Sequence, residues 1–199
     1  MNNKSILIIG NGPSALNDKF GKEINKFKIV ARINNYELKG YEKYIGNKTD
    51  VWINGANQNL KKRMQKYSKI IVSIPSSIIS AKKNKLSEHV SKRLRKSSKK
   101  FDIISFNDIQ RYENYIGHKR LTTGTTSILW GLDNFENVFI HGFDFFINSK
   151  SHYYDSKFYS FINKYILNKG YKHDNHKEKK FIQSLINDGK VEKLIDYIK

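Results

Sequence analysis

A cluster of polar side chains near the C-terminus has residue types that could move a proton. The stretch Y-K-H-D-N-H-K-E-K-K, residues 171–180, places His173 three residues before His176, with Glu178 just beyond. Histidine suits general base catalysis because its ordinary pKa lies close to neutral pH. The two histidines could also share a metal ion, but the sequence offers no third ligand of suitable type and spacing. Asn175 followed three residues later by Glu178 also resembles a capping box, which would give the glutamate a structural role.

The N-terminal run I-L-I-I-G-N-G-P-S, residues 6–14, could bind an anion. An apolar strand would end at Gly10, Gly12 would let a ligand approach the backbone closely, and Pro13 suits the first turn of a following helix. The N-terminus of such a helix attracts negative charge. The run is neither the dinucleotide fingerprint nor a Walker A loop, and a strand-to-helix turn without a ligand would have the same sequence.

Two further stretches carry polar groups that could contact a substrate. R-L-T-T-G-T-T, residues 120–126, puts hydroxyls and a glycine at the start of an apolar helical pattern. N-capping explains one of these threonines but not four, so the run could also donate hydrogen bonds to a phosphate. S-H-Y-Y-D, residues 151–155, lies in a long aromatic and polar stretch. Because loops of that length in compact domains usually cover a binding site, we expect residues 143–172 to form a lid-like segment.

These candidates need a scaffold that brings them together, and the hydrophobic pattern predicts one. The expected strands are Ser5–Ile9, Lys28–Ala31, Asp50–Ile53, Lys69–Ser73, Phe101–Ser105, Asn137–His141 and a short Val191–Ile195. The expected helices are Pro13–Phe20, Asn57–Lys66, Leu86–Lys96, Asn107–Tyr115, Gly124–Asn134 and His173–Asn187, the last ended by Gly189. Strands separated by helices indicate βαβ units. We therefore predict one α/β domain over residues 1–199, with a mostly parallel, twisted, Rossmann-like sheet flanked by helices.

Composition narrows the classes of partner. The chain has 37 Lys and Arg against 18 Asp and Glu, a formal net charge of +19, and no cysteine. The charge attracts phosphates of any kind, or it reflects only a Lys-rich composition. Residues 82–100 read as an amphipathic helix with an apolar stripe and a basic face, typical of a surface helix or of peripheral contact with an anionic membrane. The absence of cysteine excludes disulfides, and no stretch resembles a membrane span or signal peptide, so we expect a cytoplasmic protein.

The order of the motifs resembles that of the sialyltransferases. G-N-G-P-S…R-I-N-N-Y…Y-I-G-N-K-T-D-V-W-I-N is similar to their large sialyl motif, and L-T-T-G-T-T-S-I-L-W-G-L…V-F-I-H-G-F-D-F-F to their small one. H-Y-Y-D at 152–155 fits their third motif, and His173 with Glu178 fits the very small motif, H-x-x-x-x-E. The bacterial lipooligosaccharide sialyltransferases share several of these features. Animal members have a disulfide and a membrane anchor that this chain lacks, which suits a bacterial or viral homologue.

The resemblance implies a GT-A-like variant of the fold and a reaction. A cytidine monophosphate sugar, CMP-sialic acid, would donate its sugar to a hydroxyl of a glycan or glycolipid acceptor such as a galactoside, with inversion and without a metal or other cofactor. The implied donor-binding residues are Asn11, Gly12, Ser14, Asn34, Asn54, Thr122, Thr123 and Gly124, with Asp144 either a further contact or a turn residue. His173 would be the base, His152 beside Tyr153 would steady the leaving phosphate, and Glu178 would support the site. No nucleic acid is expected. The alternatives are a transferase for another nucleotide sugar and a basic module that binds nucleic acid or membrane.

Overall fold

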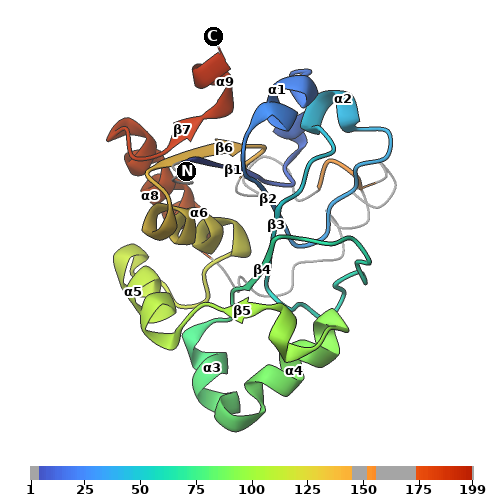
Figure 1. Cartoon of the computed structure of the whole chain (residues 1–199). Helices are drawn as coiled ribbons and strands as arrows, with labels where there is room; N and C mark the ends of the chain where they lie inside the picture. Colours follow the sequence, from blue (N-terminus) through green and yellow to red (C-terminus); the bar gives the residue numbers. More distant parts are fainter. Residues whose placement is uncertain (1–4, 145–151, 156–173, 199) are drawn as a thin grey trace.

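The computed structural model describes residues 5–144, 152–155 and 174–198 (Figure 1). Its strands are β1 (Ser5–Ile9), β2 (Val30–Ile33), β3 (Val51–Asn54), β4 (Lys69–Val72), β5 (Asp102–Ile103), β6 (Asn137–His141) and β7 (Glu192–Lys193). Its α-helices are α1 (Gly21–Lys26), α2 (Glu42–Ile45), α3 (Ser76–Lys82), α4 (Leu86–Leu94), α5 (Phe106–Ile116), α6 (Thr123–Asn134), α8 (Asn175–Asn187) and α9 (Leu194–Ile198). Short 3-10 helices are η1 (Pro13–Leu16), η2 (Lys83–Lys85) and η3 (Ser98–Lys100).

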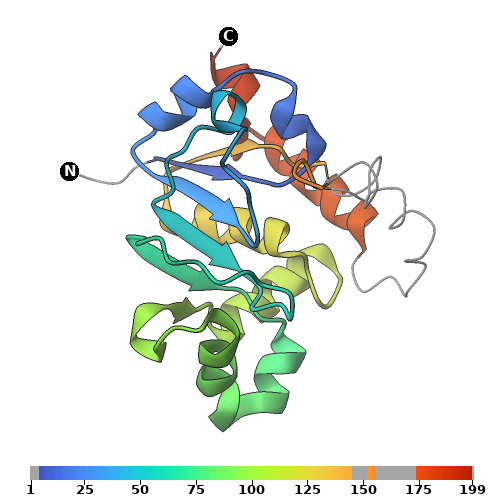
Figure 2. The ribbon, with the colours of Figure 1, turned by 90° about the vertical axis from the view of Figure 1, so that its right-hand side faces the viewer.

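The strands form one sheet in the order β5-β4-β3-β2-β1-β6-β7, and each pairing between neighbours is parallel. The predicted fold class, a mostly parallel α/β sheet flanked by helices, is confirmed. Both faces of the sheet are covered by helices (Figure 2), which explains why the strands read as continuous apolar runs.

Alternation along β1 shows how the two faces are filled. Ile6 and Ile8 pack in a core cluster with α5, α6 and α8, whereas Leu7 and Ile9 pack in a second cluster with α1 and α9. All four side chains are at most 1% exposed. Burial of each contributes about 1.5–3 kcal/mol. Since side chains point to opposite faces with a period of two, this strand must be apolar throughout.

The order of the strands reverses direction between β1 and β6, which makes this point of the sheet a topological switch point. From β1 the chain adds β2 to β5 in sequence on one side, then returns to place β6 on the other side of β1. The carboxyl ends of β1, β2, β3 and β6 therefore meet at one edge, where helix α6 also begins. Open α/β sheets bind their ligands at such a crevice.

One predicted helix, Asn57–Lys66, is wrong, because the structure has no helix there. The side chain of Asn35 holds this stretch instead: its amide nitrogen donates to the carbonyl of Asn59 at 3.0 Å, and its oxygen accepts from the amide of Lys61 at 2.8 Å. Met64 is 79% exposed, so the segment also has little apolar surface with which to anchor a helix.

Other element boundaries differ by a few residues. The predicted helix Pro13–Phe20 is instead η1 followed, after a break, by α1, and β2 lies two residues later than expected. The last predicted strand, Val191–Ile195, is reduced to β7, because α9 begins at Leu194. The short helices α2 and α3 were not predicted; α3 follows Pro75, a residue that suits a helix start but not its interior.

The basic helix predicted within residues 82–100 is present as α4. Leu86, Val90 and Leu94 are buried on one face, as the apolar stripe predicts, and Lys92 pairs with Glu88 on the exposed side. Among the described residues, no helix is both long enough and apolar enough to span a bilayer.

Candidate active site

Two turns at the carboxyl edge of the sheet begin helices: residues 10–14, called here the glycine turn, and residues 120–124, called the threonine turn. The glycine turn joins β1 to η1. A Cβ added at Gly10 would lie 2.3 Å from the carbonyl oxygen of Gly142, and the amide of Gly12 donates to the same oxygen at 2.9 Å. The glycines thus let the ends of β1 and β6 touch, which is a packing role.

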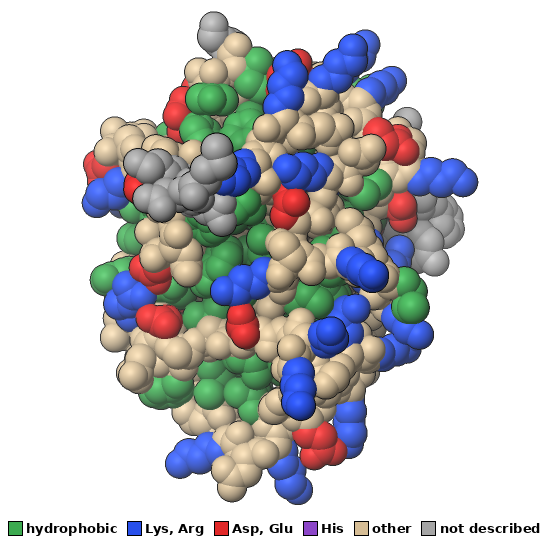
Figure 3. Space-filling view, in the orientation of Figure 1, with side chains coloured by type: hydrophobic (Ala, Val, Ile, Leu, Met, Phe, Trp, Pro, Cys, Tyr) green, Lys and Arg blue, Asp and Glu red, His purple; other side chains and the backbone are tan. Residues whose placement is uncertain are grey.

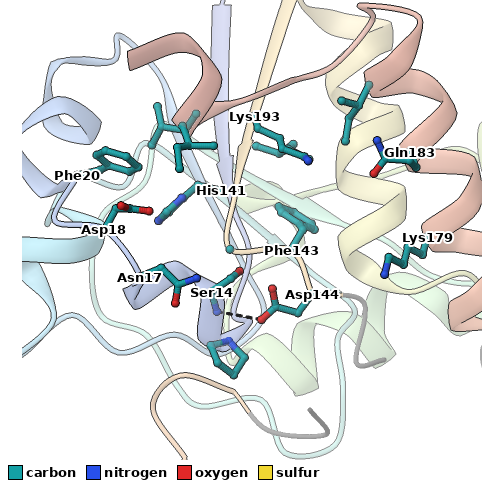
Figure 4. Close-up of a pocket in the computed structure, with 16 residues that line it drawn as sticks. Ser14, Asn17, Asp18, Phe20, His141, Phe143, Asp144, Lys179, Gln183 and Lys193 are labelled. Carbon is teal, nitrogen blue, oxygen red and sulfur yellow. Dashed lines mark hydrogen bonds between the residues drawn. The ribbon is translucent and has the colours of Figure 1, made fainter. Parts of the chain in front are cut away.

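Asp144 occupies the helix N-terminus that the glycine turn creates. Its Oδ2 accepts a hydrogen bond from the amide of Ser14 at 3.0 Å (Figure 4). A Cβ added at Gly12 would lie 2.4 Å from the same oxygen. The negative charge that this helix end favours is therefore supplied by the protein's own carboxylate.

Two asparagines of the predicted donor site hold neighbouring strand ends together. Asn11 is 6% exposed, and its amide nitrogen donates to the carbonyls of Ile33 and Asn35 at 3.0 and 2.7 Å. Asn34 lies in the left-handed region with φ of 46°, and its Oδ1 accepts from the amide of Gly55 at 3.0 Å. The backbone strain at Asn34 is of the kind that clusters at ligand sites.

Asn54, at the end of β3, has a donor that the described part of the protein leaves unsatisfied. Its side chain is fully buried, and its Oδ1 accepts from the amide of Ala56 at 3.1 Å, which fixes the orientation of the amide group. Its Nδ2 has no hydrogen-bond partner among the described residues. A buried amide donor without a partner costs about 1–3 kcal/mol, so this nitrogen is a candidate contact for a ligand.

The threonine turn opens α6, and most of its hydroxyls bond within the protein. Thr122 is the N-cap, and its Oγ1 accepts from the amide of Thr125 at 3.2 Å. Thr126 bonds the hydroxyl of Ser73, beyond β4, at 2.7 Å. Thr123 differs: within the described ranges, its hydroxyl and amide have no hydrogen-bond partner. Gly55, after β3, lies close by, since a Cβ there would approach Thr123 Oγ1 to 2.9 Å.

Glu178 supports the threonine turn from α8. It is fully buried, and its carboxylate accepts hydrogen bonds from the amide of Thr122 at 3.1 Å, from the hydroxyl of Thr122 at 2.6 Å and from the hydroxyl of Thr125. The predicted capping box with Asn175 is wrong, because Asp174 is the N-cap of α8 and accepts from the amide of Lys177. Glu178 lies one turn into the helix and faces α6 instead.

The third motif, residues 152–155, lies against the glycine turn. The amide of Tyr153 donates to the carbonyl of Asn11 at 3.0 Å, and its hydroxyl donates to the carbonyl of Glu37 at 2.6 Å. Tyr154 donates to the carbonyl of Asn35 at 3.0 Å, and the ring of His152 stacks on that of Tyr154, with centroids 5.2 Å apart. The motif therefore covers the ends of β1 and β2.

Burial sets the protonation of this motif. It lowers the pKa of His152 below the ordinary value, an effect that Asp155 opposes in part, and it raises the pKa of Tyr153 to about 12. His152 is thus a neutral ring at neutral pH, and Tyr153 keeps its proton. His173, the predicted base, lies outside the described residues, as does most of the predicted lid, 143–172.

Asn35 was not predicted as part of the site, although it bonds the glycine turn, the third motif and the segment that follows β3. Its backbone carbonyl accepts from Asn11 and Tyr154, and its side chain holds residues 59 and 61. The Asn-Asn doublet directly after β2 was the available signal. No group of three or more His, Asp and Glu residues that could hold a metal ion occurs in the described part of the chain.

A cavity of about 550 Å³ lies on the β6–β7 side of Asp144 (Figure 4). Its apolar wall includes Phe20, Phe143 and Leu194, and polar groups reach it from Asp18 and Gln183; the other residues that line it include Lys179 and Lys193. Phe143 lies between this cavity and the threonine turn, because a Cβ at Gly124 would lie 3.2 Å from its ring. The volume is typical of small-molecule sites.

The switch-point crevice, with backbone donors at a helix start, places the protein among the open α/β proteins that bind ligands at the carboxyl ends of their strands. The sequence matches glycosyltransferase family 29 (sialyltransferase) over residues 3–190, so the chain belongs to that family and is a glycosyltransferase. No curated protein sequence matches it.

Solved structures of sialyltransferases share the fold. A mammalian sialyltransferase has a TM-score of 0.72 at 17% identity, with 96% of this chain and 68% of that chain covered. A mammalian sialyltransferase in complex with Gal-beta-1-3GalNAc-ortho-nitrophenol has a TM-score of 0.69 at 17% identity, covering 96% and 69%. The sialyltransferase CstII from Campylobacter jejuni, in complex with the substrate analogue CMP-3FNeuAc, has a TM-score of 0.60 at 18% identity, covering 96% and 81%.

Proposed function

We propose that this enzyme transfers sialic acid from CMP-sialic acid to a hydroxyl of a galactoside acceptor, with inversion and without a metal. The observation that carries the proposal is the threonine turn, which is held by Glu178 and presents backbone and side-chain donors to the ends of β2 and β3. Family membership supports sialyl transfer, and two of the solved structures with the same fold were bound to a CMP-sugar analogue or a galactoside.

The donor nucleotide would lie between the threonine turn and the ends of β2 and β3. The amides of Thr123 and Gly124, the hydroxyl of Thr123 and Nδ2 of Asn54 are the donors available to it. Because the carboxylate of Glu178 already lies at this helix end, neutral acceptor atoms of the base or ribose are better partners there than a phosphate. Asn11, Gly12, Ser14, Asn34, Thr122 and Asp144 would then shape the site through the contacts described above.

In the proposed reaction, His173 takes the proton of the acceptor hydroxyl, and the oxygen attacks the anomeric carbon. The bond from that carbon to the phosphate oxygen breaks, and CMP leaves with the electron pair. A single displacement of this kind inverts the anomeric configuration. His152, neutral because burial lowers its pKa, would donate a hydrogen bond to the departing phosphate, while Tyr153 fixes the position of the motif.

The acceptor would occupy the cavity beside Phe143. Two arguments support this placement: Phe143 lines the cavity and also lies against Gly124 of the threonine turn, and the cavity combines an apolar wall with polar groups, which suits a sugar. The helix α8, whose start follows His173 in the chain, forms one wall through Lys179 and Gln183.

The same proposal places the enzyme in the cytoplasm, in peripheral contact with the inner face of a membrane that carries a glycolipid acceptor. Lysine and arginine side chains are spread over the face shown in Figure 3, including the region around α3 and α4. The exposed basic residues of this region are Lys82, Lys83, Lys85, Lys92, Arg95, Lys99 and Lys100. Each such charge near an anionic surface contributes about 1 kcal/mol.

The test is CMP release from CMP-sialic acid with lactose as acceptor, preceded by a thermal-shift series with CMP, UDP and GDP. We expect CMP to raise the melting temperature most, and His173→Ala to reduce turnover by about 10² to 10⁴-fold, the usual contribution of a general base. His176→Ala, a matched change three residues away on the exposed side of α8, should keep full activity. A larger shift with UDP or GDP would assign another donor, and full activity of His173→Ala would remove that residue from the mechanism.

A further inference from the structure

Arg120, two residues before the N-cap of α6, has a backbone conformation that needs outside support. Its φ is 68°, in the left-handed region that a residue with a side chain rarely adopts. Such a conformation costs roughly 1–2 kcal/mol and persists only where neighbouring groups fix it. Its amide donates to Oε1 of Glu113 at 3.3 Å.

Glu113 is a buried carboxylate of α5 that belongs to none of the motifs. It is 5% exposed. Besides the amide of Arg120, it accepts from the amide of Ser76 at 3.1 Å and from the hydroxyl of Ser76. One carboxylate therefore joins three segments: α5, the first residue of α3, and the threonine turn.

Glu113 and Glu178 hold the threonine turn in the same manner from two different helices. Glu178, on α8, accepts the amide of Thr122, and Glu113, on α5, accepts the amide two residues earlier. Each carboxylate also accepts a hydroxyl from the first turn of a helix: Thr125 of α6 for Glu178 and Ser76 of α3 for Glu113. Between the two anchored amides, Leu121 is buried in the main core.

We propose that Glu113 is a positioning residue for nucleotide binding: together with Glu178 it fixes the threonine turn, so that the amide and hydroxyl of Thr123 meet the donor in one geometry. This inference rests on the proposed function for its ligand, CMP, but not for the anchoring itself. Hydrogen-bond donors held in place before the ligand arrives bind more tightly, because no ordering cost is incurred on binding.

The test compares Glu113→Ala and Glu113→Gln with Tyr112→Phe. Tyr112 is the preceding residue of α5 and equally buried, and its hydroxyl bonds Asp133 rather than the threonine turn. CMP affinity is measured by calorimetry well below the melting temperature, together with KM and kcat for CMP-sialic acid. We expect Glu113→Ala to weaken CMP binding about tenfold, mainly as a higher KM, and Glu113→Gln to recover part of it, because the amide oxygen still accepts from Arg120. Tyr112→Phe should lower the melting temperature without changing CMP affinity.

Hydrogen exchange of residues 118–126 provides a readout that needs no nucleotide. Protection should fall in Glu113→Ala and also in Ser76→Ala, which removes the hydroxyl that donates to the Glu113 carboxylate. It should stay at the wild-type level in Tyr112→Phe. A folded Glu113→Ala protein with wild-type exchange and wild-type CMP affinity would overturn the proposal. Should the wild-type enzyme not bind CMP while the exchange results hold, the proposed donor would be wrong and the anchoring by Glu113 would stand.

Discussion

The glycine turn and the threonine turn begin helices at the same edge of the same sheet, yet within the described residues they differ in which backbone amides remain without a partner. In the glycine turn, Asp144 accepts the amide of Ser14 and lies against Gly12. In the threonine turn, the carboxylate of Glu178, on α8, accepts a hydrogen bond from the amide of Thr122. Within the described residues, the next two amides, those of Thr123 and Gly124, have no partner. The position of the carboxylate therefore differs between the two helix starts, and with it the amides that it leaves without a partner.

The comparison also shows why a glycine-rich turn after the first strand is weak evidence of a phosphate site. Gly10 and Gly12 are needed so that β1 can meet the chain after β6, whose carbonyl and carboxylate occupy the space that side chains would fill. Glycine allows a close approach to any neighbour, and here the neighbour is the protein.

The largest effect should come from the carboxylate that supports the threonine turn. Glu178→Ala would leave the amide of Thr122 and two threonine hydroxyls without their acceptor in a buried site, which we expect to lower the free energy of unfolding by on the order of 3 kcal/mol or more. Asp174→Ala is the matched control, since it removes the partly exposed carboxylate that caps the same α8 helix; it should lower stability clearly less than Glu178→Ala does. Equal losses in urea denaturation would show that Glu178 is an ordinary cap.

A pair of substitutions should separate the two turns. Thr123→Val keeps the shape of the side chain but removes its hydroxyl, and we expect CMP affinity to fall up to about tenfold with little change in stability, because the hydroxyl bonds no described residue. Asp144→Ala should do the opposite: it should lower stability by about 1–2 kcal/mol and change CMP affinity less than twofold, because its carboxylate caps η1.

Calorimetric titration with CMP measures the affinity of the Thr123→Val and Asp144→Ala proteins, and thermal denaturation measures their stability. Loss of CMP binding in Asp144→Ala, with Thr123→Val unaffected, would reverse the assignment and make the glycine turn the donor site.

The sequence predicts the scaffold well because the central strands β1, β2, β3 and β6 are short, largely apolar runs that end in or are followed by glycine or asparagine. It also predicts that Asn11, Asn34 and Asn54 lie at one edge of the sheet, since each lies at or just after the end of a strand and parallel strands bring their ends together. It cannot tell whether such an asparagine faces a ligand or a neighbouring strand. The amide of Asn11 bonds two carbonyls near the end of β2, a contact 22 to 24 residues away that no local pattern reveals.

Glu178 is a second residue whose partners the sequence could not predict. Local spacing predicts a capping box with Asn175, because that interaction needs only four neighbouring residues. The observed partners, Thr122 and Thr125, lie 56 and 53 residues away. Glu113 belongs to no recognisable pattern, and only the folded chain reveals its bond to Arg120. Contacts between distant helices decide these roles.

The smallest effect concerns pH and again separates the two turns. His141, at the end of β6, donates from Nε2 to the carbonyl of Ala15 in η1 at 3.1 Å. Burial lowers the pKa of His141 below its ordinary value of 6.5, although Asp18 and Asp144 oppose the shift and Arg32 adds to it. Below pH 6.5 the unfolded chain therefore takes up a proton that the folded protein resists, and stability is lost as the pH falls.

Urea denaturation at pH 7.5 and pH 5.5 checks this prediction. His141→Gln retains a donor for the carbonyl of Ala15 but cannot titrate, so its stability should change less with pH than that of the wild-type protein. His176→Gln removes an exposed histidine of α8 and should keep the full pH dependence. If His141→Gln behaved like the wild type, the pH sensitivity would originate outside the glycine turn and the β6 end that packs on it.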